Sequence, residues 1–176
     1  MAPIIRAMMV LAVVVYVAAA SLSNAMHAIG LPTLVVLAPA LPLALVVLMA
    51  RHARQPAQLS ALALLGVVLL EIGSNLVNLG RAAGDPWVPG EFLIPVATSI
   101  LWMGRWDFAI AMLLCTFGPL PSLLATDSGR HVLTQYTAYA LIALAVAVVL
   151  RTFMLRSLRA QFELEMLLRR QARTDG

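Results

Sequence analysis

Charged side chains are scarce in this chain of 176 residues. They make up 11% of the sequence, whereas hydrophobic residues make up 62% and the mean hydropathy is +0.94. A water-soluble globule of this size needs more polar residues than that to cover its surface. The composition therefore excludes a soluble domain and indicates that lipid surrounds most of the chain. Because each crossing of a hydrocarbon layer about 30 Å thick uses roughly 20 residues, no second folded domain fits.

Cysteine is nearly absent as well. The single cysteine, Cys115, lies within an apolar run, which excludes a disulfide or a cysteine-based zinc site within one chain and indicates a small buried side chain. The formal net charge of +4 comes from arginines at the edges of apolar segments, where such residues set membrane topology. We therefore predict the lipid bilayer, and not a nucleic acid, as a partner.

Glycine, proline and charged residues divide the apolar sequence into six segments. The predicted spans lie near 7–27, 31–50, 58–80, 90–104, 106–125 and 131–151. Proline lacks the amide N–H of a helix interior, so we expect the second, fourth and fifth spans to be kinked or locally unwound at Pro39, Pro42, Pro95, Pro119 and Pro121. The predicted fold class is an all-α membrane protein, a bundle of about six transmembrane helices.

Arginine placement predicts the orientation of this bundle. With a cytoplasmic N-terminus, the inside carries ten arginines, namely Arg6, Arg51, Arg54, Arg105 and the six from Arg151 to Arg173, and the outside carries two, Arg81 and Arg130. This bias predicts a multi-pass protein of the bacterial inner membrane with both termini in the cytoplasm. Arg6 and the small residues 18–20 also resemble a signal peptide, but residues after 151 are cytoplasmic in either interpretation.

Residues 152–174 contain no glycine or proline, and they alternate charged with apolar side chains. We expect them to continue the sixth span as a long cytoplasmic signalling helix. Two apolar seams, displaced around the helix as in a coiled coil with a stutter, predict a parallel homodimer; they comprise Leu155, Leu158, Phe162, Leu164, Leu168 and Ala172. Small residues of the sixth span would let two copies approach closely: Ala138, Ala140, Ala143, Ala145 and Ala147. The alternative is a basic helix lying on the anionic inner leaflet.

The last five residues, Ala172-Arg173-Thr174-Asp175-Gly176, follow this helix directly. They resemble the entry to a GGDEF domain, the diguanylate cyclase module, where a signalling helix runs into Ala-x-Thr-Asp-x-Leu-Thr-Gly-Leu. The resemblance implies that residues 1–151 are a six-span membrane sensor, as found before many such cyclases and some class III adenylyl cyclases. It also implies that residues 175–176 begin a cytoplasmic output domain that makes cyclic di-GMP from GTP. The chain itself has no Gly-Gly-Asp/Glu-Glu-Phe sequence and therefore no catalytic residue of that family.

Polar residues within the third span form the candidate ligand site. Glu71, Ser74, Asn75 and Asn78 follow the spacing i, i+3, i+4 and i+7, which places them on one helical face. A carboxylate in a span is costly unless it is enclosed, paired or hydrated, so this face should point into the bundle. Polar residues at the outer ends of the first and sixth spans complete a pocket for a small ligand from the periplasm or membrane: Ser23, Asn24, His27, His131, Thr134 and Gln135.

Three other interpretations of these polar residues stay open. The face of the third span is also typical of hydrogen bonding that only holds helices together. Glu71 on a permeation path would make the protein a small transporter or channel, although the long exit helix has no role there and no paired inverted segments occur. His27 and His131 at the ends of different spans also allow haem or metal ligation, without a local metal-binding motif.

Overall fold

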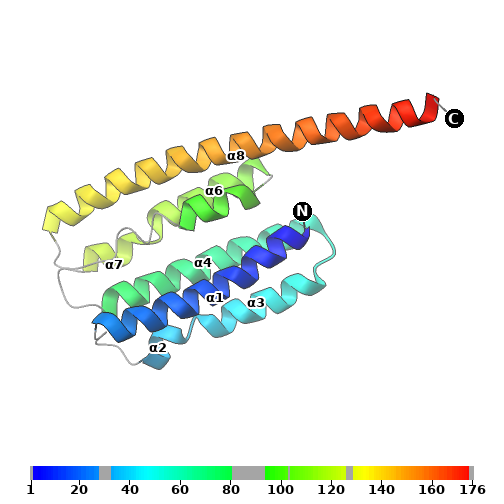
Figure 1. Ribbon diagram of the computed structural model, residues 1–176. Coiled ribbons are helices and arrows are strands. Elements are labelled where there is room, and N and C mark those ends of the chain that lie inside the picture. Colours follow the sequence, from blue (N-terminus) through cyan, green and yellow to red (C-terminus); the bar gives the residue numbers. More distant parts are fainter. Residues whose placement is uncertain (1, 28–32, 81–93, 103, 126–128, 175–176) are drawn as a thin grey trace.

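A computed structural model describes residues 2–27, 33–80, 94–102, 104–125 and 129–174, and every regular element in them is helical. The helices are α1 (Ala2–His27), α2 (Thr33–Leu37), α3 (Ala40–His52), α4 (Pro56–Gly80), α6 (Arg105–Phe117), α7 (Leu120–Ala125) and α8 (Gly129–Thr174) (Figure 1). Residues 94–98 form a short helix that continues into the 3-10 helix η1 (Ser99–Leu101). The all-helical class predicted from the sequence is confirmed for this part of the chain.

Five helical stretches are long and apolar enough to cross a membrane: Pro3–Leu22, Thr33–His52, Pro56–Leu79, Arg105–Ala125 and Val132–Leu168. Of the predicted span 90–104, the structure describes 94–102 and 104, which is too short a stretch to cross by itself. The structure thus has five long apolar helices in its described part, where the sequence predicts six spans.

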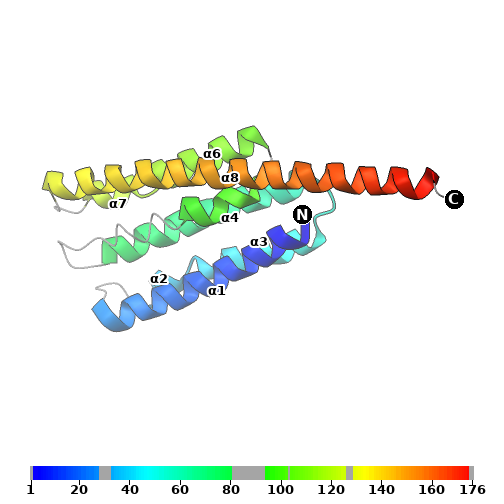
Figure 2. The same ribbon diagram turned by 45° about the horizontal axis from the view of Figure 1, so that its top comes forward.

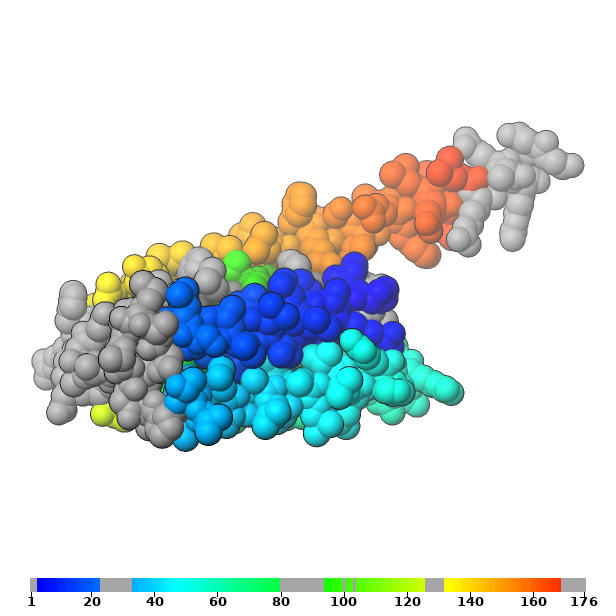
Figure 3. Space-filling view, turned by 60° about the horizontal axis from the view of Figure 1, so that its bottom comes forward, coloured from blue at the N-terminus to red at the C-terminus, as the bar shows by residue number. Residues whose placement is uncertain are grey.

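Large apolar side chains cover the outside of the bundle. Val14 of α1 is 59% exposed, Leu41 of α3 is 77% exposed and Leu141 of α8 is 64% exposed. Helices α1 and α3 form much of one face of the molecule, shown in Figure 3. A water-soluble helix turns its apolar stripe inward, so an outer surface of this kind is compatible with a multi-pass membrane protein.

Helix α4 lies at the centre of the bundle and packs against α1, α2, α3, α6 and α7 (Figures 1 and 2). It begins at Pro56, a residue well suited to the first turn of a helix because the N–H that it lacks has no partner there. Small and branched residues allow close packing around it; they include Val46 and Val47 of α3, Ala63 and Val67 of α4, and Ala111 of α6.

Two of the long apolar stretches are interrupted at prolines, as the sequence predicts. One interruption separates α2 from α3 at Ala38 and Pro39, and the other separates α6 from α7 at Gly118 and Pro119. A proline cannot donate the helical hydrogen bond, and its ring crowds the preceding turn. Each interruption therefore exposes backbone polar groups that need partners from elsewhere in the bundle.

One end of the bundle gathers basic residues, and we call it the basic end. The guanidinium of Arg6 donates hydrogen bonds to the carbonyls of Ala50 (3.0 Å) and Ala53 (2.9 Å), which fixes the start of α1 to the end of α3. An open cavity of about 870 Å³ at this end is lined by residues from four parts of the chain, including Arg6, Arg51, Arg54, Trp102, Gly104 and Asp107. Arginine at the last carbonyls of a helix also complements the helix dipole.

Helix α8 has 46 residues and is therefore about 69 Å long, more than twice the thickness of a hydrocarbon layer. Its first half packs on the bundle, where the hydroxyl of Tyr136 donates to the carbonyl of Thr116 at 2.5 Å. Ala143 and Ala147 are buried against the chain's own core, so these two alanines of the predicted dimer face are already covered. The second half of α8 extends beyond the basic end (Figures 1 and 3).

Candidate functional site

The polar face predicted on α4 divides between two environments. Glu71 and Asn75 meet the interruption between α6 and α7, whereas Ser74 and Asn78 line a cavity on the other side of α4. Residues three or four positions apart on a helix are offset by tens of degrees around its axis, which is enough to separate the two pairs. Of the four residues, Ser74 and Asn78 line this described cavity, and Glu71 and Asn75 do not.

Asn75 repairs the helical interruption at Gly118. In an uninterrupted helix the N–H of Ser122 would donate to the carbonyl of Gly118. Here the N–H of Ser122 donates to Oδ1 of Asn75 (3.0 Å), and Nδ2 of Asn75 donates to the carbonyl of Gly118 (2.7 Å). One side-chain amide thus replaces a missing backbone bond at both ends, which is valuable where water does not reach the backbone.

Glu71 packs against the same interruption. Its side chain is 4% exposed, and a Cβ added to Gly118 would lie 2.8 Å from its Oε2 and 2.9 Å from its Cγ. Because Gly118 has no side chain, the side chain of Glu71 can occupy the space next to it. Glu71 faces the bundle interior, but it is absent from the described lining of the cavity beside Ser74 and Asn78.

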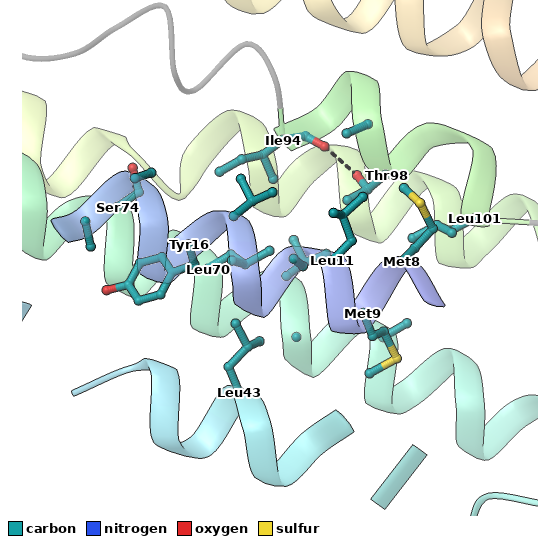
Figure 4. A pocket seen from close by; sticks show the side chains of 18 of the residues that line it. Met8, Met9, Leu11, Tyr16, Leu43, Leu70, Ser74, Ile94, Thr98 and Leu101 are labelled. Carbon is teal, nitrogen blue, oxygen red and sulfur yellow. Dashed lines mark hydrogen bonds between the residues drawn. The ribbon is translucent and has the colours of Figure 1, made fainter. Parts of the chain in front are cut away.

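That cavity has a volume of about 260 Å³ and lies between α1, α4 and residues 94–101 (Figure 4). Tyr16 stands at one side of it, with its hydroxyl donating to the carbonyl of Val36 at 2.5 Å. Its ring packs directly on Gly73, since a Cβ there would lie only 2.4 Å from Cε2 of Tyr16. Tyr16 thereby fixes the separation of α1 from α4 next to the cavity.

The cavity is polar at one end and apolar at the other. Ser74 and Asn78, near the end of α4 that is remote from the basic end, provide a hydroxyl and an amide. Toward the basic end the lining is mainly apolar and includes Met8, Met9 and Leu101, and the hydroxyl of Thr98 beside them donates to the carbonyl of Ile94 (Figure 4). Among the described residues that line the cavity there is no Arg, Lys, Asp, Glu or His. The cavity is therefore suited to an uncharged occupant with an apolar body.

One wall of the cavity is connected to α8. Residues 94–101 supply that wall, and the next residue, Trp102, is 3% exposed. The carbonyl of Trp102 accepts a hydrogen bond from Nε of Arg151 at 3.1 Å, and the Arg151 guanidinium lies 4.7 Å from the centre of the Phe108 ring. Both contacts sit where α8 leaves the bundle, so Trp102 joins the cavity wall to α8.

Other predicted site residues lie elsewhere. Gln135 is exposed on α8 and does not line the cavity, and the side chains of Asn24, His27 and His131 lie outside the described part of the structure. No group of three or more His, Cys, Asp or Glu side chains among the described residues is arranged to hold a metal ion. The haem or metal interpretation, which depended on His27 and His131, stays a prediction.

The predicted seam on α8 is largely open to its surroundings. Phe162, Leu164 and Leu168 are exposed, Leu155 and Leu158 are half-buried, and the side chain of Ala172 lies outside the described part. In one copy of the chain, these exposed apolar side chains project beyond the basic end on a helix that carries Arg156, Arg159, Glu163 and Glu165. This surface is the dimer face that the sequence predicts, although a single chain does not test the pairing.

Sequence reasoning missed the two aromatic residues of the site and their small partner. The sequence pattern predicts no role in the site for Tyr16, Trp102 or Gly73. A lone tyrosine inside an apolar span is a usable signal, because its hydroxyl needs a partner there. No local pattern marks Arg151 as a partner of Trp102, since the two are 49 residues apart.

Together these features define the structural class of the protein. Its described residues are all-helical, with five helices long and apolar enough to cross a membrane, an apolar cavity and an extended C-terminal helix. No protein-family model, no curated protein and no solved structure matches the chain.

Proposed function

We propose that this chain is the membrane sensor of a signalling protein, which transmits the state of its cavity to a cytoplasmic output domain through α8. The observation that carries the proposal is the bond between Arg151 and Trp102. It connects the cavity wall to a helix that continues without a break from the far end of the bundle to Thr174. A helix is stiff over this length, so rotation or displacement at Arg151 reaches its C-terminal end.

The unbroken course of α8 favours a projecting helix over one lying on the membrane surface. A surface helix would have to bend sharply near Arg151, where the chain leaves the hydrocarbon layer. Sharp bends need a proline, a glycine pair or an inserted group, and residues 130–174 contain neither proline nor glycine. Helix α8 runs without interruption from Gly129 to Thr174, and it is one continuous ribbon in Figures 1 and 2.

Two copies of the chain pair through the projecting part of α8 in this proposal. Phe162, Leu164 and Leu168 remain exposed in one copy, and apolar side chains in water favour burial against a partner. A parallel pair would place two output domains side by side. A change at the membrane end of α8 then alters the relative placement of the two output domains. The two placements are the two states whose populations a ligand would shift.

Six membrane crossings with both termini in the cytoplasm complete the topology. The start of α4 and the start of α6 both lie at the basic end, since Pro56 and Gly104 line the same cavity there. Helix α4 points away from that end, so the chain has to return before residue 104. This return supports a sixth crossing, and the arginines of the basic end support its placement on the cytoplasmic side.

We infer the identity of the output domain from the resemblance of residues 172–176 to the entry of a GGDEF domain. The output domain would then be a diguanylate cyclase. The direct test is the coding sequence after Gly176. Leu-Thr-Gly-Leu at the next four positions would support the assignment, and an unrelated sequence there would remove it while leaving the sensor proposal intact.

Crosslinking along α8 tests the sensor proposal itself. Single cysteines are placed at successive positions from 152 to 168 in a Cys115→Ala background, and disulfide formation is measured in membranes. A parallel pair gives dimers with helical periodicity, strongest near Phe162 and Leu168. Uniform absence of dimers would contradict the pairing and favour a helix on the membrane surface.

A further inference from the structure

We propose that the cavity between α1, α4 and residues 94–101 binds a neutral amphiphile with one medium-length alkyl chain, which enters from the surrounding lipid. The binding itself depends only on the cavity. Its role as the signal that the sensor detects rests on the proposed function.

The size of the cavity selects the apolar part of this ligand. Its volume of about 260 Å³ exceeds that of an engineered cavity of about 150 Å³ that binds benzene. It falls below the roughly 300–1,000 Å³ of sites for larger organic ligands. From Met8 to Ala20, the lining residues of α1 extend over about 18 Å of helix. A slot of this length and volume fits one alkyl chain, not the two chains of a phospholipid.

The entrance lies on the apolar exterior of the bundle. Leu11 and Val15 line the cavity and are also 50% and 55% exposed, so they form part of its rim on the outer face of α1. Ala97 is an exposed lining residue on the opposite wall. A ligand that reaches the cavity across this rim comes out of the hydrocarbon layer, which concentrates amphiphiles and excludes polar solutes.

The polar end of the cavity selects the head group. Ser74 and Asn78 lie at the end remote from the basic end and bring a hydroxyl and an amide, both able to form hydrogen bonds, into the lining. The described lining offers no charged partner, and an ionic head group would be buried there without a counter-charge. The head group is therefore uncharged and forms hydrogen bonds, as in an alcohol, a hydroxyketone or a monoacylglycerol.

The occupied cavity also has a route to α8. An alkyl chain lying toward the basic end contacts Leu101, which directly precedes Trp102. The carbonyl of Trp102 in turn holds Arg151. Ligand binding would thus shift the contact at which α8 leaves the bundle, whereas a ligand confined to Glu71 and Gly118 would act on α4 and α6 instead.

The experiment uses a ten-carbon primary alcohol that carries a mid-chain diazirine as the probe. The chain is placed in phosphatidylcholine nanodiscs, irradiated with the probe and digested, and the labelled residues are identified by mass spectrometry. We expect labels to concentrate on α1, α4 and residues 94–101. Excess 1-decanol should remove them, whereas excess decanoate, ionised at pH 8, should not.

A matched pair of substitutions on α1 provides the control. Ala12 lines the cavity, whereas Ala18 is exposed and is absent from its lining. Ala12→Leu fills the cavity and should lower the labelling about tenfold, while Ala18→Leu, the same change on the same helix, should leave it unchanged. Labelling spread evenly over the outer helices, or equal in the two variants, would overturn the proposal.

Two further outcomes identify which part of the idea fails. Competition by decanoate as strong as that by 1-decanol would contradict the neutral head group. Val15→Cys in a Cys115→Ala background tests whether a second copy of the chain covers the entrance. Disulfide dimers of this variant would show that it does, and would overturn the proposal that an amphiphile enters there. Labelling needs no output domain. Absence of cavity labelling together with periodic α8 crosslinking would contradict the ligand proposal alone. Cavity labelling together with no α8 crosslinking would contradict the sensor proposal alone.

Discussion

Arg151 donates a hydrogen bond from Nε to the main-chain carbonyl of Trp102, at 3.1 Å, at the position where α8 leaves the bundle. This contact joins a helix more than twice as long as the hydrocarbon layer is thick to the short segment that forms one wall of the apolar cavity. The charge of Arg151 also rests against the face of Phe108, an arrangement that suits a planar guanidinium better than an ammonium.

Removal of the Arg151 side chain should release α8 from the cavity wall. We expect Arg151→Leu to broaden or shift the periodic crosslinking pattern at positions 152–168, because the bond that fixes the rotation of α8 is lost. Arg156→Leu is the control, since Arg156 is exposed on the same helix. An unchanged pattern in Arg151→Leu would contradict the route from cavity to α8.

Replacement of Asn75 should destabilise the bundle strongly. Asn75→Leu leaves the N–H of Ser122 and the carbonyl of Gly118 without the partners that the amide supplies. The expected loss in the free energy of unfolding is about 2–4 kcal/mol, measured by denaturant titration in detergent micelles. Asn75→Asp retains the acceptor for Ser122 but sets an oxygen against the carbonyl of Gly118 and adds a carboxylate within a span, so its loss should be at least as large as that of Asn75→Leu.

Two glycines of α4 should respond in opposite ways to the same substitution. A Cβ at Gly73 would overlap the ring of Tyr16, whereas the nearest atom to a Cβ at Gly66 is Cδ1 of Leu43 at 3.8 Å. Gly73→Ala should therefore lower the free energy of unfolding by about 1–3 kcal/mol, and Gly66→Ala should leave it unchanged or raise it by up to about 1 kcal/mol. Thermal unfolding in detergent compares the two variants.

A double-mutant cycle identifies the cause of the Gly73 effect. Tyr16→Val removes the ring, so Gly73→Ala should cost much less in that background than in the native chain. Equal costs in both backgrounds would show that the close contact with Tyr16 is not what requires glycine.

Glu71→Gln preserves the shape of the side chain next to Gly118 and removes its charge. Because Glu71 is absent from the described lining of the cavity, we expect labelling by the decyl probe to stay within about twofold of the native level, the range of a change worth less than roughly 0.5 kcal/mol. Insertion and dimer crosslinking should also be unchanged. A large loss of labelling would return Glu71 to the ligand site that the sequence predicts.

Reporter fusions test the membrane topology. A fusion after residue 54 joins the chain at the basic end and should behave as cytoplasmic, and a fusion after residue 85 should behave as periplasmic. Alkaline phosphatase, active only outside the cytoplasm, serves as the readout at both positions. The opposite pattern would reverse the bundle and place the C-terminal part of α8 on the wrong side for a cytoplasmic output domain.

Much of the architecture follows from sequence composition and pattern. Long apolar runs divided by Gly, Pro and Arg determine where the helices lie, because backbone groups in lipid need partners within the chain and a run of about 20 apolar residues supplies them by forming a helix. The interruptions at Pro39 and Pro119 were also predictable, since a proline removes a donor at its own position. These are local properties that do not depend on distant residues.

Only the tertiary structure decided how the polar residues of α4 are used. Helical spacing placed Glu71, Ser74, Asn75 and Asn78 on one face, but the close approach of Gly118 drew Glu71 and Asn75 to the interrupted helix and left Ser74 and Asn78 for the cavity. The contacts of Tyr16 with Val36 and of Arg151 with Trp102 likewise join residues 20 and 49 positions apart. Sequence periodicity determines which side chains share a face of a helix; the packing of neighbouring helices determines what that face meets.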